Sequence, residues 1–292
     1  MPSYVYRIII SVIYLLFAPL IGGLLDGIDR KISARMQGRK GPSIFQPLWD
    51  VSKLFTKQLL TSMQFQMLMI MSYLIFIVMT GMLFFSGCDI LLCFFCLSTA
   101  AMFLVLAATC THSPYASIGT HRELMQMMSY EPMVLLTATG FYLAQNTFQI
   151  HEIVQAKYPA IFWTPGFFVG FVFILTIKFR KSPFDLSTSH HANQEVIKGV
   201  TSEMVGREYA LTTIAEWYEN VFLYGVVALF FINSNPISWA VALLAVVIVF
   251  FLEILIDNTS ARVKWQLMLK WAWGVTLVCG GLNLLILEII RR

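Results

Sequence analysis

Charged residues are scarce in this sequence. Only 12% of the 292 residues are Asp, Glu, Lys or Arg, whereas a soluble domain has about 25%. The mean hydropathy is +0.73, which indicates a protein whose solvent is largely lipid and excludes an ordinary soluble domain. The net charge of +4 is small, and no basic run with interleaved aromatic residues occurs. We therefore predict no binding of nucleic acid.

Cysteine is also infrequent, although three of the five cysteines have a suggestive spacing. Cys88, Cys93 and Cys96 follow the C-x4-C-x2-C pattern of plant-type ferredoxins. They begin an uncharged segment, and Cys110 lies a whole helix away, so no fourth ligand is near. Free cysteine is common as a small apolar residue in buried positions. We predict neither a cluster nor a disulfide here.

Long apolar segments are abundant. Crossing a bilayer takes about 20 apolar residues, and in lipid only helices can satisfy their backbone groups within one segment. The turn signal NSNP at 233–236 divides one long segment into two. Charged residues follow the first segment, which therefore does not have the pattern of a cleaved signal peptide. We predict an all-α integral membrane protein, a single polytopic domain over 1–292, with about eight spans near 5–25, 65–86, 90–110, 124–144, 159–179, 209–232, 237–256 and 267–288.

Lys and Arg are distributed unevenly over the predicted loops. If residues 26–64 face the cytoplasm, sixteen of the 20 basic residues lie on that side, as the positive-inside rule requires. Both termini are then outside.

Pro47 suits the first turn of a helix, and apolar residues recur after it at helical spacing: Leu48, Val51, Leu54, Phe55 and Leu59. This pattern predicts a cytoplasmic amphipathic helix, lying on the membrane surface or under a bound partner.

Acidic residues within the spans are the first candidates for function, because a charge there costs at least about 2.5–3.5 kcal/mol. Glu131 and Glu216 each lie seven residues into their spans, roughly 10 Å deep, and Glu219 is one turn further. No Lys or Arg lies near them in either span. Burial favours the neutral form of a carboxyl group, which lets it exchange protons. We expect a polar path from the cytoplasmic surface, or acids that only fix helix packing, involving Glu195, Glu203, Glu208, Glu216 and Glu131.

The stretch KSPFDLSTSHHANQE at 181–195 is unusually polar for this chain. Its adjacent His190 and His191 lie near Asp185 and Glu195, which is compatible with a metal site, a proton relay or a docking loop. A metal site usually needs three or four ligands in fixed geometry, and a single His pair is weak support. Because histidine titrates near neutral pH, we predict a docking loop that can also handle protons.

Several motifs occur in an order that is typical of one family of membrane subunits. They are DRKISARMQGRKGP and QPLWDVSKLFTKQ in 29–58, MMSYEP at 127–132, SPFDL at 182–186, QEVIKGVTSE at 194–203, AEWYE at 215–219 and RVKWQLMLKWAWG at 262–274. Along almost its whole length, the chain resembles the large membrane-arm subunit at the heel of respiratory complex I. It also resembles the relatives of that subunit in membrane-bound NiFe hydrogenases.

The resemblance implies a non-redox subunit of an ion-translocating oxidoreductase complex. Such subunits hold the hydrophilic redox subunits on the membrane and pass their energy to ion-pumping subunits. Their acids line the start of a polar axis, and in complex I they form much of the quinone chamber. No cofactor, metal or catalytic residue is then expected in this chain, while a NiFe centre and iron–sulfur clusters belong to partner subunits.

One departure favours the energy-converting hydrogenase branch, in which ferredoxin supplies electrons. In complex I subunits the PFD motif runs quickly into acidic residues, whereas here LSTSHHANQ separates Asp185 from Glu195. The expected partners are a NiFe large subunit, a small iron–sulfur subunit, a ferredoxin-like subunit and an antiporter-like membrane subunit, in the cell membrane of a prokaryote. The pumped ion, proton or sodium, is left open.

This interpretation assigns residues to two roles. The interface with soluble subunits comprises Asp29, Arg30, Arg35, Arg39, Asp185, His190 and His191, and the ion path comprises Glu131, Glu195, Glu203, Glu208, Glu216 and Glu219. One alternative is a quinone-chamber subunit of a complex I-type oxidoreductase. The other is a stand-alone ion transporter, for which inverted-repeat halves would be expected and none is evident.

Overall fold

The computed structural model describes residues 2–58, 64–111, 113–184, 186–187 and 198–291. Within these ranges the chain is helical, and the only strand-like pairing is an isolated bridge between Asp89 and Gln149. The predicted all-α class is confirmed. The main helices are α1 (Pro2–Met36), α2 (Gln46–Thr56), α3 (Gln64–Phe85), α4 (Ile90–Thr109), α5 (Pro114–Gln145), α6 (Ile150–Gln155), α7 (Pro165–Lys178), α8 (Arg207–Leu229), α9 (Ile237–Thr259), α10 (Trp265–Val275) and α11 (Leu282–Arg291).

Local sequence signals account for several helix ends. Pro47, Pro114 and Pro165 lie in the first turns of α2, α5 and α7, where the missing N–H leaves no hydrogen bond unmade. The side chain of Asp89 accepts a 2.8 Å hydrogen bond from the backbone N–H of Leu91 and caps α4. A π-helical segment, η3 (Thr276–Gly281), joins α10 to α11, so that these form one continuous rod.

Five helical segments among the described residues are long and apolar enough to cross a membrane. They are residues 6–36, 64–85, 90–109, 237–259 and 265–290, and the protein is a multi-pass membrane protein. The helices α5 and α8 are long but contain two and three acidic residues, respectively, and α7 is apolar but has 14 residues. Eight spans therefore remain a prediction.

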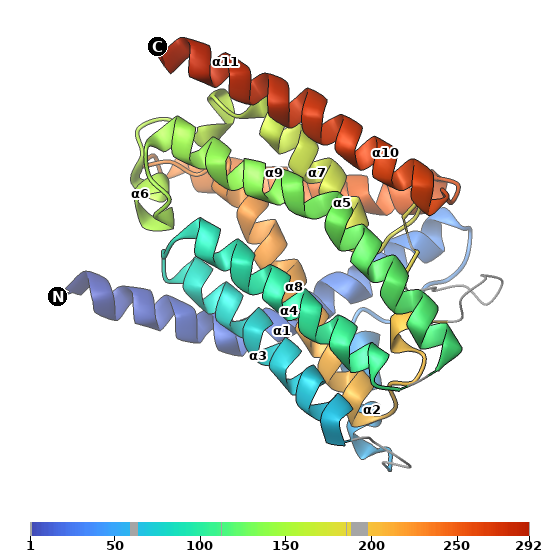
Figure 1. The fold of residues 1–292 in the computed structure, drawn as a ribbon. Helices are drawn as coiled ribbons and strands as arrows, with labels where there is room; N and C mark the ends of the chain where they lie inside the picture. The colour runs from blue at the N-terminus through green and yellow to red at the C-terminus, as the bar shows by residue number, and fades with distance from the viewer. Residues whose placement is uncertain (1, 59–63, 112, 185, 188–197, 292) are drawn as a thin grey trace.

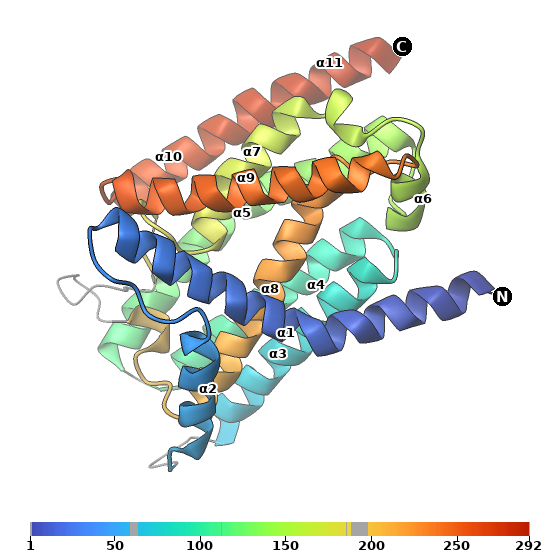
Figure 2. The ribbon, with the colours of Figure 1, turned by 180° about the vertical axis from the view of Figure 1, so that it is seen from behind.

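Helix α8 lies at the centre of the bundle (Figure 1). It packs against α1, α2, α3 and α9, while α5 packs against α4 and α7. The α10–α11 rod crosses one edge over α5 and α7, and α9 and α1 lie together on the opposite side (Figure 2). Helix α2 packs on α1 and α8 through Pro47 and Val51, with Trp49 exposed. An amphipathic surface helix is thus present at the predicted position.

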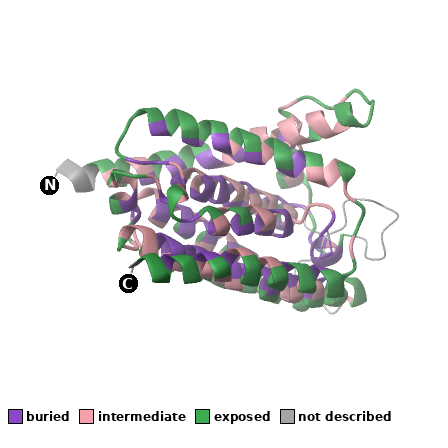
Figure 3. Ribbon diagram, turned by 90° about the horizontal axis from the view of Figure 1, so that it is seen from above, coloured by how far each residue is buried: buried purple, intermediate pink, exposed green. Residues whose placement is uncertain are grey.

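Burial follows this arrangement (Figure 3). Phenylalanines such as Phe94, Phe222 and Phe230 fill the centre, whereas the outer faces of α9 and α11 display large apolar side chains. Leu243 is 70% exposed and Ile289 is 73% exposed. An apolar outer face is the surface that a lipid-embedded helix presents, because lipid does not drive apolar side chains inward.

Small residues allow α1 to approach α8 closely. A Cβ atom on Gly22 would lie 2.6 Å from both Cβ and the backbone oxygen of Trp217. Any larger side chain at position 22 would push α1 away from α8. This contact places the polar end of α1, with Asp26 and Asp29, beside the acidic face of α8.

Candidate functional site

The segment KFRKS at 178–182 ends α7 and ties four other helices together through its polar groups. Lys178 forms a 2.8 Å ion pair with Glu219 of α8, and Lys181 forms a 2.6 Å ion pair with Asp29 of α1. Arg180 reaches Glu123 of α5, and the backbone N–H of Ser182 donates to Asp257 of α9 at 2.8 Å. Arg180 adopts a left-handed backbone conformation, with φ of 53°. We name this segment the cationic loop.

The Lys178–Glu219 pair is almost completely buried. The two side chains are 8% and 9% exposed. Lys178 also donates to the hydroxyl oxygen of Tyr130 at 3.1 Å, and the hydroxyl of Tyr73 donates to Glu219 at 3.3 Å. A buried ion pair is tolerated when such hydrogen bonds satisfy the remaining polar atoms. Tyr73 and Tyr130 therefore support a charge pair that lipid could not solvate.

Arg180 holds two carboxylates. Its Nε and Nη2 donate to the two oxygens of Glu123 at 3.2 and 2.9 Å, and its Nη1 donates to Glu216 at 2.9 Å. Burial by itself lowers the pKa of Arg180, but Glu123 and Glu216 raise it by more, so the guanidinium stays charged. Glu123 directly precedes the predicted span 124–144. Its burial raises its pKa, and Arg180 more than offsets that effect, leaving the pKa of Glu123 below its ordinary value.

The inner cluster is formed by Lys178, Arg180, Glu123, Glu216 and Glu219. With all of them ionised, three carboxylates face two cations, so one negative charge is in excess. Glu123 and Glu219 are 4% and 9% exposed, whereas Glu216 is 37% exposed and shares its cation with Glu123. Glu216 is therefore the most exposed carboxylate of the inner cluster, and it has no cation to itself.

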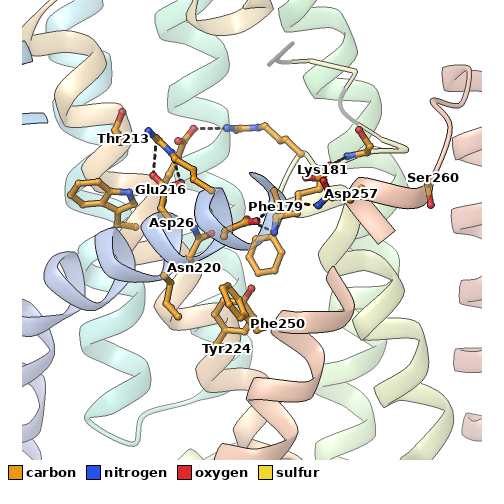
Figure 4. A pocket seen from close by; sticks show the side chains of 18 of the residues that line it. Asp26, Phe179, Lys181, Thr213, Glu216, Asn220, Tyr224, Phe250, Asp257 and Ser260 are labelled. Atoms are coloured by element: carbon orange, nitrogen blue, oxygen red, sulfur yellow. Dashed lines mark hydrogen bonds and ion pairs between the residues drawn. The ribbon is translucent and has the colours of Figure 1, made fainter. Parts of the chain in front are cut away.

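A cavity of about 620 Å³ opens beside the inner cluster. Figure 4 shows Glu216 and Asp26 on one side of it, Lys181 and Asp257 on another, and Tyr224 and Phe250 at its apolar end. Its lining comes from α1, the cationic loop, α8 and α9. Polar groups from segments far apart in sequence thus line one cavity.

The predicted site residues are distributed unevenly around this cavity. Asp29, Arg30 and Glu216 line it, and Glu219 lies in the inner cluster. Arg30 pairs with Asp26 at 2.9 Å. The predicted residues away from the inner cluster are Glu131, half-buried on α5, Glu208, buried in the first turn of α8, and Glu203, Arg35 and Arg39, none of which is buried. Asp185, His190, His191 and Glu195 lie outside the described residues.

The acids of the inner cluster have cations beside them, which the sequence pattern did not show. Lys178 lies at the end of the predicted span 159–179, and Arg180 and Lys181 follow it in the predicted cytoplasmic loop. All three pair with carboxylates of other helices. Glu123 and the buried Glu253 of α9 were also missed. The one available signal was the concentration of basic residues at the end of a short apolar span, which does not reveal their partners.

Metal ligation has no support in the part of the chain that the structure describes. No group of three or more His, Cys, Asp or Glu side chains there could hold a metal ion. The five cysteines are free thiols, and Cys93 is fully buried in the core. The polar network joins the cationic loop to α1, α5, α8 and α9 through ion pairs and hydrogen bonds.

Comparisons with known proteins agree with this architecture. A family model described as NADH dehydrogenase matches residues 8–288. Component C of hydrogenase-4 from Escherichia coli is 29% identical over 290 residues, covering 90% of this chain and 89% of that protein. An NADH-quinone oxidoreductase subunit from Syntrophobacter fumaroxidans is 25% identical over 303 residues, covering 91% of this chain and 90% of that protein.

A solved structure has the same fold. The chain superposes with a TM-score of 0.86 on a chain of the membrane-bound sulfane sulfur reductase, an archaeal respiratory membrane complex. The match covers 96% of this chain and 99% of the other, at 22% sequence identity.

The fold and the site together define a multi-pass helical membrane protein with a buried ionic network and no metal centre among its described residues. Within that class the chain belongs to the NADH dehydrogenase family, and its relatives there are subunits of NADH-quinone oxidoreductase and of hydrogenase-4. Its resemblance to the heel subunit of complex I and to hydrogenase membrane subunits is confirmed.

Proposed function

We propose that this chain is the membrane-anchoring and energy-coupling subunit of an energy-converting NiFe hydrogenase. It links ferredoxin-dependent proton reduction, or hydrogen oxidation, to the translocation of protons or sodium ions. The likeness to component C of hydrogenase-4 over 90% of the chain supports this branch. The acid-free sequence LSTSHHANQ after Asp185 supports it too.

The inner cluster is the observation that carries the coupling role. The cationic loop overlaps the start of the stretch 181–195, which is predicted to dock a soluble partner. A displacement of the cationic loop would act on Lys178, Arg180 and Lys181 together, because all three lie within four residues. Each of these three residues pairs with a carboxylate on a different helix. A change at the surface would therefore alter which of these carboxylates has a cation beside it.

The free energies involved are of matching size. Removing one partner from a buried ion pair costs about 3–5 kcal/mol. Moving one elementary charge against a membrane potential requires about 2.3 kcal/mol per 100 mV. The free energy of one ion pair in the inner cluster is therefore as large as the free energy needed to move one ion across the membrane. A redox-driven displacement that breaks such a pair could drive that movement. Glu216, exposed to the cavity and only half-compensated, is the residue that takes up or releases the ion.

The test separates redox activity from ion translocation in the intact complex. We expect Glu216→Gln to retain ferredoxin-linked hydrogen evolution and to lose gradient formation by at least ~10-fold, because glutamine cannot exchange a proton. Glu131→Gln is the second variant, and Glu152→Gln, at an exposed position on α6, is the matched control. Gradient formation at the wild-type level in both Glu131→Gln and Glu216→Gln would contradict the coupling role.

A quinone-chamber subunit is the second candidate, and the cavity favours it. Its volume of about 620 Å³ falls within the range of roughly 300–1,000 Å³ typical of small-molecule sites. The aromatic side chains of Tyr209, Trp217 and Tyr224 line it. Quinone that co-purifies with the complex, or inhibition by quinone-site inhibitors, would select this alternative. Co-purification of a NiFe subunit with iron–sulfur partners would select the hydrogenase.

The proposed topology places both termini outside a prokaryotic cell membrane and the cationic loop in the cytoplasm. Reporter fusions after the last residue distinguish the two orientations. We expect activity at the C-terminus from a reporter that works only outside the cell. Activity from a reporter that works only in the cytoplasm would show that the topology is the reverse.

A further inference from the structure

Glu253 is the acidic residue that the inner cluster leaves unexplained. It lies in α9, one of the helices long and apolar enough to cross a membrane, and it is 0% exposed. Neither of its carboxyl oxygens makes a hydrogen bond with another described residue. An acid in such a helix is costly to insert, by about 2.5–3.5 kcal/mol or more. Leucine or alanine would fill the same place at no such cost.

The surroundings of Glu253 are polar on one side. Phe250 and Asp257 stand three residues before and four residues after it, on the same face of α9, and both line the cavity. The groups whose charges act on Glu253 are Lys181 of the cationic loop, Asp257 of α9 and Asp29 of α1. The charge of Glu253 also acts on Tyr224 of α8, which lines the cavity. Glu253 thus lies on α9 between Phe250 and Asp257, two residues that line the cavity.

The other two acids of this group already have partners. Asp29 pairs with Lys181 at 2.6 Å and accepts from Ser33 at 3.2 Å, and Asp257 accepts from the backbone N–H of Ser182. Among the described residues, Lys181 is the single cation whose charge acts on Glu253. A buried carboxylate with neither a cation nor a hydrogen bond is strongly disfavoured relative to the neutral acid. Glu253 therefore holds a proton while Lys181 stays with Asp29.

Lys181 lies near the face of α9 that carries Glu253. Its ammonium nitrogen lies 6.0 Å from the centre of the Phe250 ring, one helical turn from Glu253 on the same face of α9. Asp29, in contrast, is half-buried and borders the cavity, so water can solvate its carboxylate after Lys181 leaves. A short rotation of the lysine side chain would carry its charge from α1 to α9.

We propose that Glu253 is a proton-binding site, and that the Lys181 ammonium exchanges between Asp29 and Glu253 as that proton comes and goes. When the Glu253 O–H bond breaks, the proton passes to water in the cavity, and Lys181 neutralises the new carboxylate. When Glu253 is reprotonated, Lys181 returns to Asp29. The total charge of Asp29, Lys181 and Glu253 therefore changes only by the one proton that is released or bound. Only the use of this proton in ion translocation rests on the proposed function.

Infrared difference spectroscopy of the purified membrane complex tests the site directly. Protonated carboxyl groups have a carbonyl band that shifts in D₂O, and exposed carboxyl groups lose it once they ionise. We expect wild-type protein near neutral pH to retain such a band and Glu253→Gln to lose it. Glu152→Gln, the matched substitution at an exposed position, should keep it. An unchanged band in Glu253→Gln would overturn the proposal.

Two further variants keep the test decisive if Glu253→Gln fails to assemble. Asp29→Asn leaves Lys181 free to pair with Glu253, so the band should disappear near neutral pH although Glu253 is intact. Lys181→Gln removes the cation, so the band should persist to more alkaline pH. A band that responds to neither variant would refute the exchange. If these bands behave as expected while Glu216→Gln and Glu131→Gln still form a gradient, the proton site stands and the coupling role falls.

Discussion

The strongest prediction concerns Arg180, whose guanidinium compensates two carboxylates at once. In Arg180→Gln, Glu123 keeps its place between α5 and the cationic loop at 4% exposure without a cation. Removing one partner of a buried pair costs about 3–5 kcal/mol, chiefly because the other charge is left behind. We therefore expect a loss of about 3–5 kcal/mol in stability, seen as a fall in Tm of order 10 °C.

A double-mutant cycle identifies the source of this loss. Glu123→Gln alone should also destabilise the protein, and Arg180→Gln combined with Glu123→Gln should cost less than the sum of the two, because no buried charge is then uncompensated. Arg30→Gln is the matched control. Arg30 is 44% exposed and its pair with Asp26 lies at the surface of the cavity, so its loss should cost about 0–1 kcal/mol.

The assay is thermal unfolding of the purified protein in detergent, with the same preparation used for all variants. An equal fall in Tm for Arg180→Gln and Arg30→Gln would refute the reasoning, because burial would then not affect how much an ion pair contributes to stability. Strict additivity in the Arg180 and Glu123 cycle would also refute it.

Two other predictions follow from the structure. Gly22→Ala should destabilise the α1–α8 contact by about 1–3 kcal/mol, because its Cβ would meet the backbone of Trp217, whereas Gly274→Ala, with no atom within 4 Å, should not destabilise the protein in the same thermal assay. The lowered pKa of Glu123 contributes stability that is fully present above the ordinary glutamate pKa of about 4.3 and is lost as pH falls through the lowered value. Unfolding measured against pH should therefore show an acid-side loss that is smaller in Glu123→Gln, and an identical acid limb in both proteins would contradict the assignment.

The cationic loop is the part of this chain to which the proposed coupling role assigns the response to a redox partner. Lys178, Arg180 and Lys181 project to different sides of one short loop, and their partners lie on α1, α5 and α8. Because each pair is largely buried, changing one changes the others through the shared backbone. Under the proposed function, a displacement of this loop would therefore act on three helices at once.

Apolar periodicity and charge scarcity determined the class of this protein from sequence alone. Long uncharged segments must be helices in lipid, which predicted helices in these regions and a surface helix after Pro47. The helix bounds were less predictable: α1 continues to Met36 and α5 begins at Pro114, about ten residues beyond the predicted spans. The motifs around Glu131 and Glu216 indicated the family, because they occur in a fixed order along the chain. Local signals such as NSNP at 233–236 placed the ends of helices for the same reason: they depend only on neighbouring residues.

Only the tertiary structure decided which charges meet. Lys181 and Asp29 are 152 residues apart in sequence, and Arg180 and Glu123 are 57 apart, so no local pattern can pair them. The sequence suggested carboxylates without nearby cations, whereas packing brings two cations to three carboxylates and leaves Glu253 without an ion-pair partner among the described residues. The reason is physical: a buried charge is stable only with a partner, and the partner is chosen by how helices pack, not by what stands beside it in the chain.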